Sequence, residues 1–253
     1  MSLLNHLPAR ILFRLSLPIV ALQGLWLRRT AVRLPEASGE KTGVSGQGAR
    51  IDLLAIGDSI IAGVGTGTVE RSLPVQFSHS LAASRSCSVH WRVEGSNGAN
   101  IEGMRKRISN IDRNQKADVI LISIGVNNVT GLSSTRNWRF NFNALVVDLK
   151  RKWPESRVIF AGLPPMGKFP LPPQPLRFLL GRRAMVLDRI AADIISQQSH
   201  MFHIPTDIDP VAQEFCEDGF HPSAESCATW AKELAQRFET ANLAEQKSTI
   251  GLK

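Results

Sequence analysis

The residues best suited to chemistry in this sequence are a serine at the end of an apolar run and, far downstream, an acid and a histidine three residues apart. Ser59 closes a Gly-Asp-Ser tripeptide that directly follows the apolar run Ile51–Ile56, and Asp218 precedes His221. A serine hydroxyl needs a base to attack a carbonyl group, and a carboxylate can fix the tautomer of that base. We therefore predict nucleophilic catalysis with Ser59 as nucleophile, His221 as general base and Asp218 as the orienting acid.

Two further segments can stabilise the negative charge that develops in such a reaction. Gly98 lies between an apolar run and the beginning of a helix-like segment, where a backbone amide favours an anion. Asn127 follows the next apolar run and can direct its side-chain amide to the same point. We expect an oxyanion hole made of the Ser59 and Gly98 backbone amides and the Asn127 side chain.

The elements that must position these residues alternate along the chain between short apolar runs and helix-like segments. Runs rich in Val, Ile and Leu that alternate with helices predict a parallel sheet covered on both faces, with ligands at the carboxyl ends of the strands. The predicted strands are Ile51–Ile56, Val89–Val93, Val119–Ile124, Val158–Ala161 and Met201–Ile204, and the predicted helices are Val75–Ala83, Ile101–Ile111, Trp138–Lys152, Arg183–His200 and Ala224–Glu239.

The four segments together resemble the SGNH (GDSL-type) hydrolases, a family of esterases and lipases. All four family blocks are present in the family's order, and the resemblance covers about residues 51–240. It implies that Ser59 is the nucleophile, that Gly98 rather than Gly95 is the glycine of the second block, and that Asn127 is the asparagine. It also implies a flavodoxin-like α/β fold: a three-layer α/β/α sandwich around a mostly parallel, five-stranded sheet.

One residue departs from the family pattern, and one acid competes with Asp218. The third block usually ends in Asn-Asp, whereas here Asn128 follows Asn127. This departure supports an alternative hypothesis, an inactive module that binds an acylated ligand. Asp207, which follows the last predicted strand, is the rival candidate for the orienting acid.

A proline-rich apolar stretch, Leu163–Leu180, interrupts the alternation of strands and helices. Prolines exclude a central strand and a helix interior, so we predict a stiff loop at the same sheet edge as Ser59, where it walls a pocket. The alternative is a packed connection over the core. From an apolar loop that walls a pocket we expect an ester substrate with a short-chain or lipid-like acyl group. The expected pocket residues are Ile60, Pro165, Met166, Phe169 and Phe220.

The first fifty residues differ from the rest of the chain. They hold seven basic and two acidic residues, in a chain of formal net charge +8. Their apolar stretch 11–27 is interrupted by Arg14 and Pro18 and is too short between Arg14 and Arg28 to cross a bilayer comfortably. Three interpretations stay open: an uncleaved anchor, an interfacial helix and a helix packed on the domain. We expect membrane-surface association through residues 11–33, so the location is either cytoplasmic or membrane-associated.

Composition limits the other function classes. The chain has 253 residues, of which 43% are hydrophobic and 21% charged, enough for one sizeable core. Three cysteines without metal-ligand spacing favour free thiols or at most one disulfide, and we predict no metal, no cofactor and no nucleic-acid partner. The predicted organisation is an apolar basic segment (1–33), a linker (34–50), a catalytic domain (51–240) and a polar tail (241–253).

Overall fold

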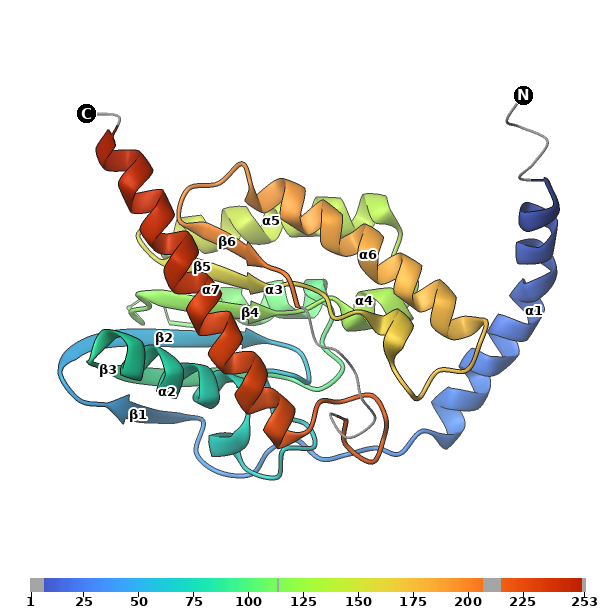
Figure 1. Ribbon diagram of the computed structural model, residues 1–253, viewed down its shortest axis with the longest axis horizontal. Helices are drawn as coiled ribbons and strands as arrows, with labels where there is room; N and C mark the ends of the chain where they lie inside the picture. Colours follow the sequence, from blue (N-terminus) through green and yellow to red (C-terminus); the bar gives the residue numbers. More distant parts are fainter. Residues whose placement is uncertain (1–6, 113, 207–214, 252–253) are drawn as a thin grey trace.

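The computed structural model describes residues 7–112, 114–206 and 215–251, and its centre is a six-stranded sheet (Figure 1). The strand order is β1-β3-β2-β4-β5-β6. The neighbouring pairs from β3 to β6 are parallel, and β1 alone is antiparallel to its neighbour. The strands are β1 (Thr42–Gly46), β2 (Ala49–Gly57), β3 (Cys87–Gly95), β4 (Val119–Ser123), β5 (Arg157–Ala161) and β6 (Met201–Ile204).

The mostly parallel α/β fold and all five predicted strands are confirmed, but the sheet has six strands rather than five. The additional strand β1 lies in residues 34–50, which were predicted to be a linker, so that prediction is wrong for this part. Its sequence, Thr-Gly-Val-Ser-Gly, carries almost no apolar signal. The strand forms by tertiary packing: the Trp91 ring fills the space beside Gly43, where a Cβ would lie 2.3 Å from the ring, and Ser45 hydrogen-bonds to Ser78.

Helices cover both faces of the sheet, and the strands alternate their side chains between the two resulting cores (Figure 1). Leu54 and Ile56 of β2 face one core, whereas Leu53 and Ala55 face the other, as expected for a strand buried on both sides. The first core is closed by α3 (Ile101–Asn110), α4 (Val126–Thr130), α5 (Thr135–Lys152) and α6 (Leu176–Ile195), and the second by α2 (Leu73–Arg85) and α7 (Ala224–Gly251).

Helices α6 and α7 extend furthest beyond their predicted limits. Helix α6 begins at Leu176, inside the stretch predicted as a loop, because Pro175 directly before a helix removes no needed hydrogen bond. The loop is therefore confined to about residues 163–175 and contains a short 3₁₀ turn, η2 (Met166–Lys168). Helix α7 continues through the predicted polar tail, where Asn242 is buried and Glu245 pairs with Arg157.

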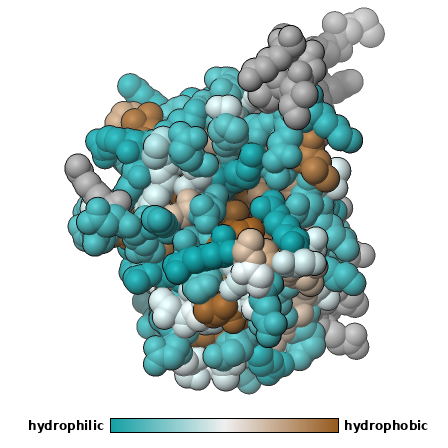
Figure 2. Space-filling model, turned by 90° about the vertical axis from the view of Figure 1, so that its left-hand side faces the viewer, coloured by the Kyte–Doolittle hydropathy of each residue, from teal (hydrophilic) through white to brown (hydrophobic). Residues whose placement is uncertain are grey.

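The first helix, α1 (Leu7–Thr30), lies at the end of the sheet where the parallel strands terminate (Figure 1). Val20 and Leu27 pack against the first core, and Gln23 hydrogen-bonds to the chain just before α6. Within the described residues, no helix combines the length and apolarity needed to span a membrane. The opposite end of the sheet presents a mostly hydrophilic surface with small, separate hydrophobic spots (Figure 2).

Candidate active site

Ser59 lies in the turn directly after β2, at the carboxyl end of the sheet. The strand ends approach each other closely here: a Cβ on Gly57 would lie 2.0 Å from the Ser123 carbonyl oxygen. The Asp58 amide donates to that same carbonyl at 3.1 Å. Only glycine permits this approach, and the result is a rigid turn that fixes where the Ser59 hydroxyl points.

The structure brings Asp218, His221 and Ser59 into one hydrogen-bonded chain, although Ser59 is 162 positions from His221. Asp218 Oδ2 lies 2.6 Å from His221 Nδ1, and His221 Nε2 lies 2.9 Å from Ser59 Oγ. Both distances are within the range of strong hydrogen bonds. The imidazole is therefore oriented by the carboxylate on one side and available to the serine hydroxyl on the other.

The Asp218 carboxylate is held in its ionised form by its surroundings. Burial opposes ionisation, but the His221 ring and the backbone amides of His221 and Phe220 all donate to the carboxylate. These hydrogen bonds outweigh burial and lower the pKa of Asp218 below its ordinary value. An ionised Asp218 can stabilise a positively charged imidazole during proton transfer.

The predicted oxyanion donors come from three segments: the turn that holds Ser59, the loop between β3 and α3 that holds Gly98, and the first turn of α4, which holds Asn127. Gly98 has φ +76°, which favours glycine, whereas Gly95 ends β3 and packs on the Ala62 backbone, where a Cβ would lie 2.1 Å from the Ala62 nitrogen. Within the described part of the chain, the Ser59 and Gly98 amides take part in none of the backbone hydrogen bonds. Asn127 Nδ2 donates to the Ala99 carbonyl at 2.8 Å, which leaves its second N–H.

Asn128, the departure from the family pattern, has a structural role. Its side chain is fully buried, and its Oδ1 accepts a hydrogen bond from the Ile101 amide, the first of α3, at 3.0 Å. Its Nδ2 donates to Ser133 Oγ at 3.0 Å. An amide oxygen therefore caps α3 where a carboxylate also would, and the amide nitrogen adds a bond that a carboxylate cannot donate.

Asp58, the residue before Ser59, is a buried acid with an unusual environment. Its Oδ1 accepts from the Ile60 amide at 3.1 Å, whereas its Oδ2 has no partner among the described residues. Burial raises the pKa of Asp58 to about 7, against the opposing effects of the Ile60 hydrogen bond and the nearby His221. Asp58 thus organises the turn and titrates near neutral pH.

Residues 55–228 match the model of the GDSL-like lipase/acylhydrolase family. The chain belongs to this family. As a GDSL-like acylhydrolase, it is a carboxylic-ester hydrolase. No curated protein sequence matches the chain.

Solved structures similar to this GDSL-like acylhydrolase confirm the fold. A lipase from a goat rumen metagenome is 16% identical, with 73% of this chain and 95% of that chain covered and a TM-score of 0.61. The esterase EstA from Pseudoalteromonas, solved with monoethylphosphonate as inhibitor, is 15% identical, with coverages of 76% and 98% and a TM-score of 0.59. A family 2 carbohydrate esterase with a carbohydrate-binding domain, from Corynascus thermopiles (Myceliophthora fergusii), is 16% identical, with coverages of 82% and 68% and a TM-score of 0.58.

A narrow apolar cavity opens beside Ser59 and His221. Its cavity volume is only about 20 Å³. Phe169 packs edge-on against both Phe215 and Phe220, at ring-centroid distances of 5.1 and 5.4 Å. The lining residues are Ser59, Ile60, Val126, Pro164, Pro165, Phe169, Phe215, Phe220, His221, Pro222 and Trp230.

Four of the five predicted pocket residues line this cavity, and Met166 does not. Met166 is fully buried in the core on the α3–α6 face of the sheet. Sequence reasoning missed Phe215 and Trp230, which come from the segment before Asp218 and from α7. Their proximity in sequence to the Asp-x-x-His block was the only available signal. The rival acid Asp207 lies outside the described residues.

The proline-rich loop is attached to the loop that carries the histidine. The Leu171 amide donates to the Gly219 carbonyl at 3.1 Å, and Gly219 has φ +62°, so the turn between Asp218 and His221 needs this residue's flexibility. The Cys216 amide donates to the His221 carbonyl at 2.8 Å. The pocket wall and the imidazole are therefore positioned by the same set of backbone contacts.

The cysteines do not compete with Ser59 as nucleophiles. Cys87, Cys216 and Cys227 are free thiols. Burial raises the pKa of each, to about 12 for Cys227. A thiol is nucleophilic as the thiolate, so burial lowers the reactivity of these groups.

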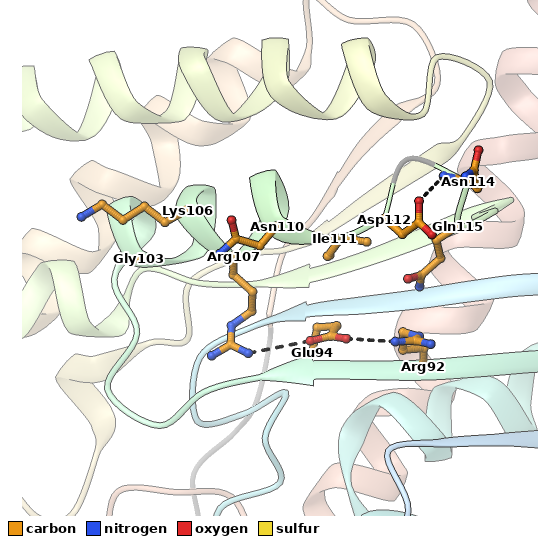
Figure 3. A pocket seen from close by; sticks show the side chains of 10 residues that line it. All are labelled: Arg92, Glu94, Gly103, Lys106, Arg107, Asn110, Ile111, Asp112, Asn114 and Gln115. Carbon is orange, nitrogen blue, oxygen red and sulfur yellow. Dashed lines mark hydrogen bonds and ion pairs between the residues drawn. The ribbon is translucent and has the colours of Figure 1, made fainter.

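A second, wider depression lies between β3 and α3 (Figure 3). It is polar and open, and none of its lining residues belongs to the Ser59 site. Its central charges are already paired, because Glu94 lies 3.4 Å from Arg92 and 3.7 Å from Arg107. Among the described residues, no group of His, Cys, Asp and Glu side chains has the arrangement of a metal site.

Proposed function

We propose that this hydrolase cleaves carboxylic esters with short acyl groups through an acyl-serine intermediate on Ser59. His221 acts as general base and acid, and Asp218 fixes and stabilises the imidazole. The observation that carries the proposal is the hydrogen-bonded chain from Asp218 Oδ2 through both nitrogens of His221 to Ser59 Oγ, at 2.6 and 2.9 Å.

In the first half of the reaction, Ser59 Oγ forms a bond to the ester carbonyl carbon while its proton moves to His221 Nε2. The carbonyl oxygen becomes an oxyanion that accepts hydrogen bonds from the Ser59 and Gly98 amides and from Asn127. When the tetrahedral intermediate collapses, the bond to the alcohol oxygen breaks, and Nε2 returns the proton to the departing alcohol.

In the second half, water replaces the alcohol. His221 Nε2 takes a proton from the water, whose oxygen attacks the acyl carbon, and the same oxyanion donors stabilise the second intermediate. The bond to Ser59 Oγ breaks, Ser59 regains a proton from Nε2, and the carboxylic acid leaves. The ionised Asp218 stabilises the charged imidazole in both halves.

The cavity beside Ser59 supports a short acyl group. Its walls are apolar, and the cavity volume of about 20 Å³ holds little more than a methyl group. Longer acyl chains need the rings of Phe215 and Phe220 to rotate, which disrupts their packing on Phe169. We therefore expect acetyl and other short acyl esters to be preferred over long-chain esters.

The test is hydrolysis of p-nitrophenyl esters from acetate to palmitate by the wild type and by Ser59→Ala. We expect turnover of the short esters to fall by about 10⁴- to 10⁶-fold in the variant, because the nucleophile is lost. The matched control is Ser109→Ala, an exposed serine on α3 that only bonds its own helix, which should retain full activity. Persistent turnover in Ser59→Ala contradicts the mechanism, and a preference for palmitate contradicts the acyl assignment.

A serine-reactive phosphonate tests the alternative of an inactive binding module. The wild type should gain the mass of the phosphonyl group on the peptide that contains Ser59, whereas Ser59→Ala should not. The alternative was based on Asn128 in place of the usual aspartate. The hydrogen bonds of Asn128 to Ile101 and Ser133 explain this departure structurally. Labelling of neither protein would favour the binding module.

A further inference from the structure

The exposed face of α1 has the opposite polarity to an ordinary surface helix. From residue 17 to residue 27, every exposed side chain is apolar, and Leu22 and Trp26 are 67% and 57% exposed. Surface helices normally direct charged and polar side chains to solvent. The exposed positions in this segment are Leu17, Pro18, Ile19, Ala21, Leu22, Leu25 and Trp26.

The polar residue of this segment points toward the protein instead. Gln23 is half-buried, donates to the Gln174 carbonyl at 2.7 Å and accepts from the Leu176 amide at 3.2 Å. Val20 and Leu27 pack on the first core beside it. Because these contacts fix the rotation of α1, the apolar face is directed outward while the helix is attached to the domain.

The charges around this face are positive. Arg28, Arg29 and Arg33 are exposed at the carboxyl end of α1, and the sequence contains no acidic residue before Glu36. The neighbouring α6 adds the exposed Phe178 and Met185. They alternate with the exposed Arg182 and Arg189 at intervals of three or four residues, so all four lie on one side of that helix. Apolar side chains with a tryptophan, bordered by arginines, are typical of helices that lie in the interface of an anionic membrane.

We propose that the outward face of α1 binds the surface of an anionic lipid bilayer, with the helix lying in the plane of the interface. Spanning is not required, since no described helix is long and apolar enough for it. If a second copy of the chain covered this face with its own α1, arginines would face arginines, because α1 contains no acidic residue. Anionic lipid headgroups, in contrast, complement the arginines.

The attachment would set the orientation of the hydrolase. Helix α1 lies at the carboxyl end of the parallel strands, which is the end that carries Ser59 (Figure 1). Through Gln23 it is bonded to residues 174–176, which continue the loop that supplies Pro164, Pro165 and Phe169 to the cavity. Membrane binding would therefore bring the cavity wall close to the lipid surface, whatever acyl group the site accepts.

The experiment is sedimentation of the full chain with vesicles of phosphatidylcholine alone or with 30% phosphatidylglycerol. We expect binding to the anionic vesicles, weakened at least about tenfold by Leu22→Glu/Leu25→Glu, because charges replace two exposed leucines that would enter the lipid interface. Arg28→Gln/Arg29→Gln should also weaken binding about tenfold and reduce its sensitivity to salt. The matched control is Phe140→Glu/Val147→Glu, which introduces the same charges at two exposed apolar positions of α5 and should bind like the wild type.

Circular dichroism and thermal unfolding establish that each variant is folded, and light scattering without lipid reports the oligomeric state. The proposal is overturned if the wild type does not bind anionic vesicles, or if the α1 and α5 double variants lose binding equally. It is also overturned if the wild type is a dimer that Leu22→Glu/Leu25→Glu converts to a monomer without affecting vesicle binding, since a second copy then covers the face.

Discussion

Among the described residues, two aspartate–histidine pairs can be compared, and one of them is hydrogen-bonded to Ser59. Asp218 and His221 are 2.6 Å apart, and Asp188 and His203 are 2.8 Å apart. Both histidine side chains are 12% exposed, so distance and burial do not distinguish the pairs. The pairs differ in which imidazole nitrogen the carboxylate binds and in what surrounds the ring.

In the Asp218–His221 pair, the carboxylate binds Nδ1 and leaves Nε2 for Ser59. In the other pair, Asp188 binds Nε2, the ring stacks on Phe160 in the core, and Asp188 also accepts from the Leu163 amide. Asp188 and His203 thus connect α6, β6 and the start of the proline-rich loop. His221 is thus linked to a serine hydroxyl, whereas Asp188 and His203 link elements of the fold.

Among the substitutions that test this difference between the two pairs, Asp218→Asn should have the largest effect on turnover. The amide nitrogen would face His221 Nδ1 and favour the tautomer whose Nε2 carries the hydrogen, which cannot accept the Ser59 proton. We expect kcat to fall about 10⁴-fold with KM little changed. Steady-state kinetics on p-nitrophenyl acetate measure this, and Asp188→Asn is the matched control, with activity within a few-fold of wild type. Equal losses in both variants would contradict the assignment.

The second prediction concerns Asn127, the proposed side-chain donor to the oxyanion. Asn127→Ala should lower kcat by about 10²- to 10³-fold, or about 3–4 kcal/mol of transition-state stabilisation, because one donor is lost. Asn143→Ala, which removes an exposed asparagine bonded only to its own helix, is the control. An effect on KM alone would mean that Asn127 binds substrate without stabilising the oxyanion.

The third prediction uses the buried acid beside the Asp218–His221 pair. The pKa of Asp58 is raised to about 7, above its unfolded value of about 4, so between these pH values the folded state holds a proton that the unfolded state has lost. Stability from this group therefore decreases as pH rises from about 4 to about 7. Between pH 4 and pH 8, we expect the free energy of unfolding of the wild type to fall by on the order of 3 kcal/mol more than that of Asp58→Asn. Urea unfolding across this range measures it, and parallel curves for the two proteins would show that Asp58 ionises normally.

The fourth prediction tests the Asp188–His203 pair itself. Asp188→Asn keeps an oxygen for the Leu163 amide but removes the charge beside His203, so we expect a loss of about 1 kcal/mol in the free energy of unfolding. Chemical denaturation at pH 7 gives this value. A large loss of turnover in a variant that is still folded would instead assign Asp188 a positioning function at the site.

The smallest effect is expected in the polar depression between β3 and α3. Glu94→Gln removes the charge that pairs with Arg92 and Arg107, all of them at least partly exposed. We expect a change within about 0.5 kcal/mol in stability and no change in turnover, because exposed ion pairs contribute little. A marked loss of turnover would mean that this depression takes part in the reaction.

The candidate site residues and most of the elements could be located from the sequence because their signals are local. A buried parallel strand appears in the sequence as a continuous apolar run, and the turn after it appears as glycine and polar residues. All five predicted strands and the place of Ser59 after β2 could therefore be predicted. Strand β1 was not, because its pairing depends on Trp91 and Ser78, which lie far along the chain. The extension of α7 likewise depends on burial of Asn242 and on the contact of Glu245 with Arg157.

The sequence by itself determined which residue types stand at the strand ends, and hence the class of chemistry. Only the tertiary structure decided their distances, since the contact between Ser59 and His221 joins positions 162 residues apart. It also decided that Phe215 and Trp230, rather than Met166, line the cavity, and that Asp188 pairs with His203. Local periodicity specifies strands and helices, whereas pocket walls and long-range pairs depend on how these elements pack.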